Sequence, residues 1–172
     1  QLRIDDGMRF VDGLDESFVV VLVDSTDPVG PGARLFSEAF YRSIRRCLRM
    51  RGILAVQAGV PFLQRRAFSS TLCNLSSVFK FSACYLLASP SYIGGHLAIG
   101  WGSDSLRADG PSVAMLEERM ARSRLKLRYY TPEVHKAAFA LPPYIAELAN
   151  GDAARDPLDH RMLERHRQVV EA

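Results

Sequence analysis

The 172-residue sequence lacks the features that mark several specialised classes of protein. It has three cysteines, an odd number, and no visible secretory segment, so we expect reduced, buried thiols and a cytoplasmic protein. No apolar run approaches the roughly 20 residues that cross a bilayer, which argues against a membrane protein. The histidines show no metal-ligand spacing, and the net charge is only +3. What remains is a globular domain with 48% hydrophobic residues, long enough to bury a sizeable core.

A glycine-rich turn of the G-x-G-x-x-G type, which cradles phosphates in dinucleotide-binding domains, is also missing. Arginines, by contrast, gather at residues 42–51 and 119–128. Such clusters could form a nucleic-acid surface, but acidic residues such as Glu117 and Glu118 stand beside them. Mixed charges favour the solvated face of a helix. We therefore expect no nucleic-acid partner.

The most informative segment is an apolar run followed by two carboxylates. Residues 18–23 (FVVVLV) show no alternation, which is typical of a strand buried on both faces. Asp24 and Asp27 follow, and the prolines and glycine at 28–31 cannot continue a strand or a helix. Ligands of open α/β sheets bind outside the carboxyl ends of the strands, so two acids here could serve a reaction. The spacing fits equally well an aspartate that only caps the next helix.

Four further segments carry motifs that are weak alone but highly specific together. They are residues 4–10 (IDDGMRF), 52–57 (GILAVQ), 90–95 (PSYIGG) and 129–142 (YYTPEVHKAAFALP). Together with residues 24–31 they resemble, in the same order, segments of the spermidine synthase family of aminopropyltransferases. The family also carries a glycine-rich loop and an N-terminal β-domain that this sequence does not contain. The resemblance therefore covers roughly residues 2–148 and is to the C-terminal part of a spermidine synthase.

Periodicity and Gly/Pro punctuation predict alternating strands and helices. We expect strands at 2–5, 18–23, 53–57, 81–88 and 96–101. Helices are expected at 8–11, 37–48, 62–78, 113–122 and 137–148, the last interrupted near Pro142-Pro143. This order predicts an α/β fold. It is the C-terminal part of a Rossmann-like, class I methyltransferase-like sheet, with helices on both faces and a closing antiparallel strand pair. Residues 1–150 would form this partial domain, and 151–172 a tail that is either mobile or helical at 158–170.

The resemblance implies a reaction in which an aminopropyl group passes from decarboxylated S-adenosylmethionine, a co-substrate, to putrescine or a similar amine. The products would be spermidine and methylthioadenosine, and no prosthetic group or metal is implied. A diamine is protonated at neutral pH, with a pKa near ~10, so the attacking nitrogen needs a base. The resemblance makes Asp24 that base. It assigns substrate binding to Asp27, Gln57 and Tyr92, and cofactor binding to Asp6, Gly7, Pro31 and Leu35.

Structural alternatives stay open for several of these residues. Asp6 could be only a helix cap, a role for which Asp5 competes, Gln57 could satisfy a loop, and Tyr92 could be a half-buried aromatic residue. His135 has no acid or cysteine at catalytic spacing, which predicts a structural role.

Two functions from different classes are compatible with the sequence. The chain could belong to an active aminopropyltransferase, or it could be a catalytically inactive remnant that acts as an interaction module. In either case the strand at 18–23 would lack the neighbour that it has in the family fold and become a sheet edge. We therefore expect a homo-oligomer, since family members are commonly dimers, or a companion N-terminal segment.

Overall fold

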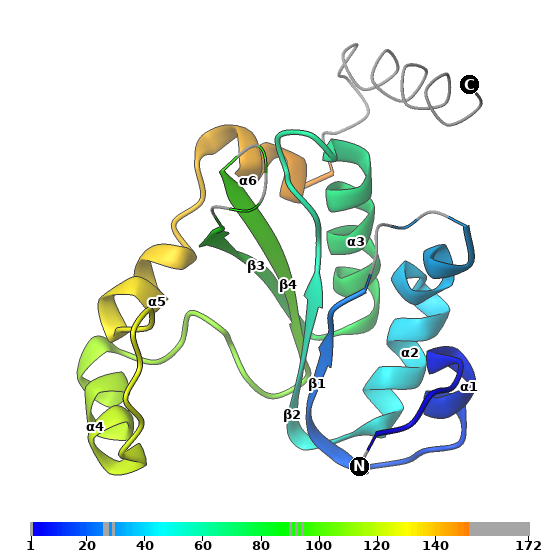
Figure 1. The fold of residues 1–172 in the computed structure, drawn as a ribbon, viewed down its shortest axis with the longest axis horizontal. Helices are drawn as coiled ribbons and strands as arrows, with labels where there is room; N and C mark the ends of the chain where they lie inside the picture. Colours follow the sequence, from blue (N-terminus) through cyan, green and yellow to red (C-terminus); the bar gives the residue numbers. More distant parts are fainter. Residues whose placement is uncertain are drawn as a thin grey trace.

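A computed structural model describes residues 2–25, 28, 30–89, 91, 93 and 95–151, without the side chain of Pro31. Within these residues, eleven elements follow one another (Figure 1). They are α1 (Gly7–Asp12), β1 (Phe18–Val23), the 3-10 helix η1 (Gly30–Phe36), α2 (Glu38–Cys47), β2 (Leu48–Gln57), α3 (Arg65–Val78), β3 (Phe81–Ala88), β4 (His96–Ser103), α4 (Val113–Ser123), α5 (Pro132–Ala138) and α6 (Pro143–Ala149).

The strands form one mixed sheet in the order β1-β2-β4-β3. β1 and β2 run parallel, whereas β4 is antiparallel to both β2 and β3. Parallel neighbours joined through a helix, with an antiparallel pair at the far side, are the arrangement expected from the sequence. The predicted α/β fold class is confirmed.

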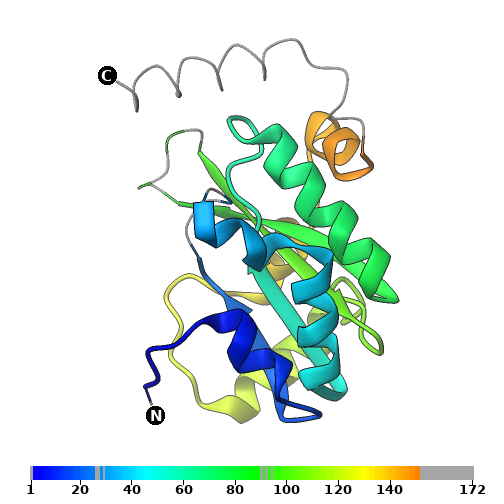
Figure 2. The ribbon, with the colours of Figure 1, turned by 90° about the vertical axis from the view of Figure 1, so that its right-hand side faces the viewer.

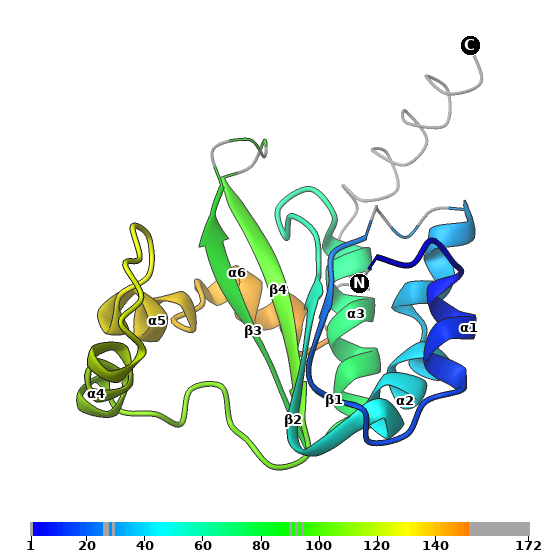
Figure 3. The same ribbon diagram turned by 60° about the horizontal axis from the view of Figure 1, so that its bottom comes forward.

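The core lies between the sheet and one layer of helices. α2 and α3 cover one face, α1 lies beside α2, and α6 packs against α3 (Figure 2). Fully buried side chains from three elements fill this layer: Tyr41 and Ile44, Leu54 and Val56, and Phe68 and Leu75. α2 turns its apolar stripe inward and begins at Ser37, whose Oγ accepts a hydrogen bond from the Phe40 amide at 3.2 Å. Figure 3 shows α4 and α5 on the opposite side of the sheet, standing away from it.

Several element boundaries differ from expectation for identifiable reasons. Residues 2–5 do not form the predicted strand, because no described strand lies beside them. α3 begins at Arg65 rather than at residue 62, because the amides of Leu63 and Gln64 both donate to the Val60 carbonyl in a turn. The segment expected as a helix at 137–148 contains two helices: α5 begins earlier, at Pro132, where Thr131 caps it, and α6 begins at Pro143, where the interruption was expected. The expected helix at 158–170 lies outside the described residues.

β1 is not buried on both faces, although its composition predicted this. Val19 is 57% exposed, Val20 45% and Leu22 74%. The reason is its place in the sheet: β1 is an edge strand, and among the described elements none pairs with its outer side. The sequence-based expectation that this strand would become an edge therefore agrees with the observed topology.

Candidate active site

The carboxyl ends of β1 and β2 meet at one edge of the sheet. Val23 pairs with Val56 in the parallel register, so Asp24 and Gln57, the next residues, stand at neighbouring strand ends. Gln57 in turn pairs with Ile99 of the antiparallel β4. The end of β3 and the start of β4, where Ala88 pairs with His96, therefore lie at the same end of the sheet. The topology thus brings Asp24 and Gln57 together, two residues that the sequence proposed separately.

Asp24 is solvent-exposed at this edge of the sheet. Its side chain is exposed, and it has no hydrogen-bond or ion-pair partner within the part of the chain that the structure describes. The helix-cap alternative does not hold for Asp24, because Ser37 caps the next α-helix. Its carboxylate is therefore available to a ligand. Asp27 and Tyr92, the predicted amine-binding residues, lie outside the described residues.

Gln57 is buried, with 8% of its surface exposed. It lines a small cavity of about 10 Å³ together with Phe36 of η1, Gln64 and Thr71. Such a volume holds about one water molecule. The Gln57 side chain thus lies in the interior, beside residues of η1 and α3. Its binding of an amine stays a prediction.

The loop after Gln57 is held in place by a residue that the sequence analysis missed. The Gln64 Oε1 accepts a hydrogen bond from the Val60 amide at 2.8 Å. Gly59 has a φ of +78°, and a Cβ there would collide with the Gln64 amide oxygen. The Ala58 amide donates to the Ala98 carbonyl, and the Ala98 amide to the Gly59 carbonyl, both at 2.8 Å. These bonds fix the loop to β4 and set the position of the strand end. In the sequence, only Gly59 indicated a constrained loop here, and a single glycine does not show that Gln64 is the residue that constrains it.

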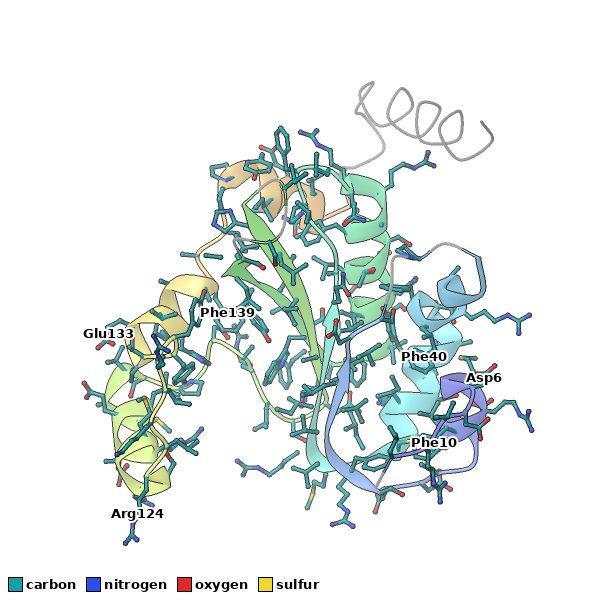
Figure 4. All side chains as sticks on the ribbon, viewed as in Figure 1. Asp6, Phe10, Phe40, Arg124, Glu133 and Phe139 are labelled. Atoms are coloured by element: carbon teal, nitrogen blue, oxygen red, sulfur yellow. The ribbon has the colours of Figure 1, made fainter. Side chains whose placement is uncertain are left out.

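The predicted cofactor-binding residues Asp6, Gly7 and Leu35 also come together. The Asp6 Oδ1 caps α1 by accepting from the amides of Met8 at 2.8 Å and Arg9 at 3.4 Å. Figure 4 shows Asp6 at the start of this helix. Asp5 does not cap the helix; it accepts from the Asp6 amide. A Cβ on Gly7 would lie 3.5 Å from the Leu35 Cδ2, so these two residues are in contact.

The helix η1 connects the two groups of candidate residues. Leu35 lies against Gly7, and the adjacent Phe36 lines the cavity at Gln57. Gly7, predicted to bind the adenosyl group, and Gln57, predicted to bind the amine, therefore lie beside consecutive residues of η1. The side chain of Pro31, the remaining predicted cofactor contact, falls outside the described part.

Other residues singled out from the sequence have structural surroundings. The Nδ1 of His135 lies 3.3 Å from the Tyr130 hydroxyl and its Nε2 lies 3.2 Å from the Ala108 carbonyl, which agrees with the structural role expected for it. Burial raises the pKa of the Cys47 thiol and raises that of Cys84 to about 12. Cys73, contrary to expectation, is exposed.

The arginines of α2 belong to a solvated, ion-paired surface. Arg45 pairs with Asp104 at 2.6 Å, and Arg46 with Asp15 at 3.2 Å. All four side chains are more than a third exposed. This agrees with the interpretation of the cluster as a helix face rather than a nucleic-acid surface. Within the described ranges, no cluster of histidine, cysteine and carboxylate side chains could hold a metal ion. Over the same residues, no helix has the length and apolar character to cross a membrane.

Comparison with known proteins connects this geometry to a family. The model of the spermine/spermidine synthase domain matches residues 1–112. The chain belongs to this family. The family resemblance found in the sequence is thereby confirmed.

Bacterial enzymes are among the relatives of this chain, which matches their C-terminal part. The polyamine aminopropyltransferase of Ruegeria sp. (strain TM1040) is 46% identical over 147 residues, which are 86% of this chain and 52% of that protein. The enzyme of the same name from Pseudomonas syringae pv. tomato is 44% identical over 149 residues, or 87% of this chain and 52% of the relative. The chain thus spans about half the length of the curated relatives that it matches.

Solved structures give the same relationship. A spermidine synthase in complex with the transition state analogue AdoDATO superposes with a TM-score of 0.80 at 28% identity, covering 87% of this chain and 50% of that one. Spermidine synthase from Thermotoga maritima gives 0.76 at 28% identity, covering 86% and 48%. The fold described above is therefore that of one half of a spermidine synthase.

Proposed function

We propose that this chain carries the amine-activating part of a polyamine aminopropyltransferase, with decarboxylated S-adenosylmethionine as co-substrate and putrescine or a similar diamine as acceptor. The observation that carries the proposal is the exposed carboxylate of Asp24, which has no partner among the described residues and lies beside Gln57 at the carboxyl edge of the sheet. A relative that is 46% identical over 147 residues bears the name of this activity.

The chemistry explains why a carboxylate is needed there. A neutral primary amine attacks the methylene carbon beside the sulfonium; a C–N bond forms, the C–S bond breaks, and methylthioadenosine leaves as a neutral thioether. The proton on the attacking nitrogen passes to Asp24. The sulfonium needs no acid, because a thioether is already a good leaving group. In this proposal Asp27, Gln57 and Tyr92 bind the amine.

The adenosyl group of the co-substrate would lie on the other side of η1. Asp6, Gly7, Pro31 and Leu35 are the residues we assign to it. The Asp6 Oδ1 caps α1, and its Oδ2 is the atom we assign to the adenine amino group. This arrangement would place the reacting methylene between the two groups of residues.

We expect the 172-residue chain alone to transfer no aminopropyl group. It contains no glycine-rich turn to approach the cofactor closely, and positioning supplies much of such a rate. Activity therefore requires a companion segment, supplied either in the same polypeptide or by an assembly. The alternative function, an inactive interaction module, differs in that no companion would restore transfer.

The test is a chimera in which the part of the Ruegeria enzyme that precedes the matched segment is fused ahead of this chain. We expect transfer to putrescine by the chimera, and a turnover at least about 100-fold lower in its Asp24→Asn variant, the usual worth of a positioned base. Asp15→Asn, which changes an exposed carboxylate at the other end of β1, should leave turnover within about twofold.

Two results would contradict the proposal. A folded Asp24→Asn chimera that keeps more than a third of the turnover would remove Asp24 from the base role. A folded chimera that transfers to no diamine would favour the interaction module instead.

A further inference from the structure

A groove of about 770 Å³ lies at the end of the sheet opposite Asp24. Asp15 and Glu16, which precede β1, line this groove together with the first residues of β2 and the residues that follow β4. β1 rises by roughly 3.3 Å for each of its six residues, so the groove and Asp24 are about 20 Å apart. The groove is therefore separate from the candidate active site. Its volume is that of a site for a small organic ligand.

Five arginines line the groove, three from α2 and two from β2: Arg42, Arg45, Arg46, Arg49 and Arg51. The three on α2 form exposed ion pairs with carboxylates. Arg49 and Arg51 form no ion pair with any described residue. Of the carboxylates in the lining, Glu16 is the one without an ion pair among these residues. The groove thus keeps a small excess of positive charge that its own side chains do not neutralise.

The Arg49 side chain is anchored at one nitrogen. Its Nε donates to the Glu16 carbonyl at 2.8 Å, and its two terminal nitrogens make no hydrogen bond within the described part of the chain. A planar guanidinium offers parallel N–H groups that match two oxygens of a phosphate group. Because the Nε bond already restricts the side chain, less entropy is lost when an anion binds. Arg49 is therefore preorganised to bind an anion.

The backbone of Arg51 is left-handed. Among the described residues, three other than glycine have a positive φ, and two of them, Glu16 at +39° and Arg51 at +67°, line this groove. A left-handed backbone disfavours residues with a Cβ and persists where the surrounding structure imposes it. Such residues gather at functional sites. Their coincidence in one groove indicates that the backbone here is shaped for more than the connection of two elements.

The two unpaired arginines stand on a bulge at the start of β2. The register with β1 passes from Leu48 to Ile53, so residues 49–52 lie opposite a single residue of β1. A Cβ on Gly52 would collide with the Arg49 carbonyl oxygen at 2.8 Å, which shows how tightly the bulge turns. The bulge therefore carries two guanidinium groups on a short, constrained segment of chain.

We propose that this groove binds a small phosphorylated anion, with Arg49 and Arg51 as the ligands of the phosphate oxygens. The ion-paired arginines of α2 add to the positive field around them. The Glu16 carboxylate opposes it, which limits the site to a ligand with few charges. A nucleic-acid surface requires many more unpaired cations. The site is distinct from the proposed function and does not depend on it.

The experiment is a calorimetric titration of the 172-residue chain with pyrophosphate at low ionic strength. We expect saturable binding of one equivalent that added salt weakens. Inorganic phosphate should bind more weakly, because it offers fewer oxygens to the two guanidinium groups. ADP carries the same two phosphate groups on a nucleoside. Tighter binding of ADP would identify the ligand as a nucleotide, and equal binding would identify it as a free phosphate; both results support the site.

Three variants locate the anion. Arg49→Gln and Arg51→Gln should each weaken pyrophosphate binding at least about fivefold. Arg124→Gln is the matched control, because Arg124 is also exposed, has a φ of +56° and lies at the outer end of α4 (Figure 4). It makes the same change in the same backbone conformation and should weaken binding less than about twofold. All three positions are exposed, and thermal unfolding without ligand verifies that each variant is folded.

A fourth variant tests the sign of the electrostatics. Glu16→Gln removes the opposing carboxylate and should strengthen pyrophosphate binding about twofold or more.

Three results would overturn the inference. One is the absence of saturable binding with pyrophosphate, phosphate and ADP. Another is an equal loss of binding in Arg49→Gln, Arg51→Gln and Arg124→Gln, since the anion would then respond only to the net charge of the chain. A short single-stranded RNA that binds far more tightly than pyrophosphate and displaces it would make the groove part of a nucleic-acid surface instead.

Discussion

Replacing Gly59 by alanine should loosen the loop that follows the candidate site. Gly59 has a φ of +78°, a conformation that costs a residue with a Cβ roughly 1–2 kcal/mol. The new Cβ would also collide with the Gln64 amide oxygen, which accepts the Val60 amide at 2.8 Å. Losing that hydrogen bond costs a further roughly 0.5–1.5 kcal/mol. The expected loss in the free energy of unfolding is therefore about 1.5–3.5 kcal/mol.

Urea unfolding of the single and double variants separates the two causes. In a Gln64→Ala background the collision is gone, so Gly59→Ala should cost only the backbone strain, about 1 kcal/mol less than in the parent chain. Gly13→Ala is the matched control, because Gly13 has a φ of −92° and a Cβ there would meet no atom within 4 Å. It should change the unfolding free energy by less than about 0.5 kcal/mol.

The reasoning would be refuted by either of two outcomes. If Gly59→Ala costs no more than Gly13→Ala, the loop tolerates the left-handed residue and Gln64 does not constrain it. If Gly59→Ala costs the same with and without the Gln64 side chain, the loss comes from the backbone alone.

Two further predictions concern the buried interior. Ser103 is fully buried, its Oγ donating to the Gly52 carbonyl at 2.8 Å and accepting from the Leu106 amide at 3.1 Å, so Ser103→Ala should cost about 1–3 kcal/mol in urea unfolding. The exposed Ser76→Ala serves as its control, and a similar small loss in both would contradict the argument. Burial raises the pKa of the Cys84 thiol from its ordinary 9.0 to about 12. Above pH 9 the unfolded chain therefore loses this proton while the folded chain keeps it, which lowers the free energy of unfolding as the pH rises toward 12. The unfolding free energy should therefore fall between pH 8 and pH 10, and by less in Cys84→Ala; equal falls in the two proteins would exclude Cys84 as the cause.

The local elements of this fold could be predicted closely from the sequence. β1 occupies residues 18–23 as expected, because a run of β-branched residues ending at Asp24 leaves little choice. α2 begins where Ser37 offers a side-chain cap and ends within a residue of its expected position. The start of α5 was predicted five residues too late, at residue 137. The prediction followed the apolar residues after 137 and did not use Thr131-Pro132, which is a typical start of a helix.

For the candidate site, too, the sequence predicted the types of residue and the structure decided which of them are neighbours. The sequence placed acids and a glutamine after apolar strands, and the family resemblance gave them roles. The register of β1 with β2 then decided that Asp24 and Gln57 are neighbours. Whether Asp6 or Asp5 caps α1 depended on which carboxylate reaches the Met8 amide, and spacing alone left that open.

By itself, the sequence determined the order of strands and helices, the family and the chemistry of the residues at the strand ends, since these depend on side-chain type and on neighbours a few positions away. The tertiary structure decided which of those residues meet, that Gln64 supports the loop at Gly59, and that β1 lies exposed at the edge of the sheet. Burial is a property of the whole assembly of elements. A strand that reads as buried can be exposed when none of the described elements covers it.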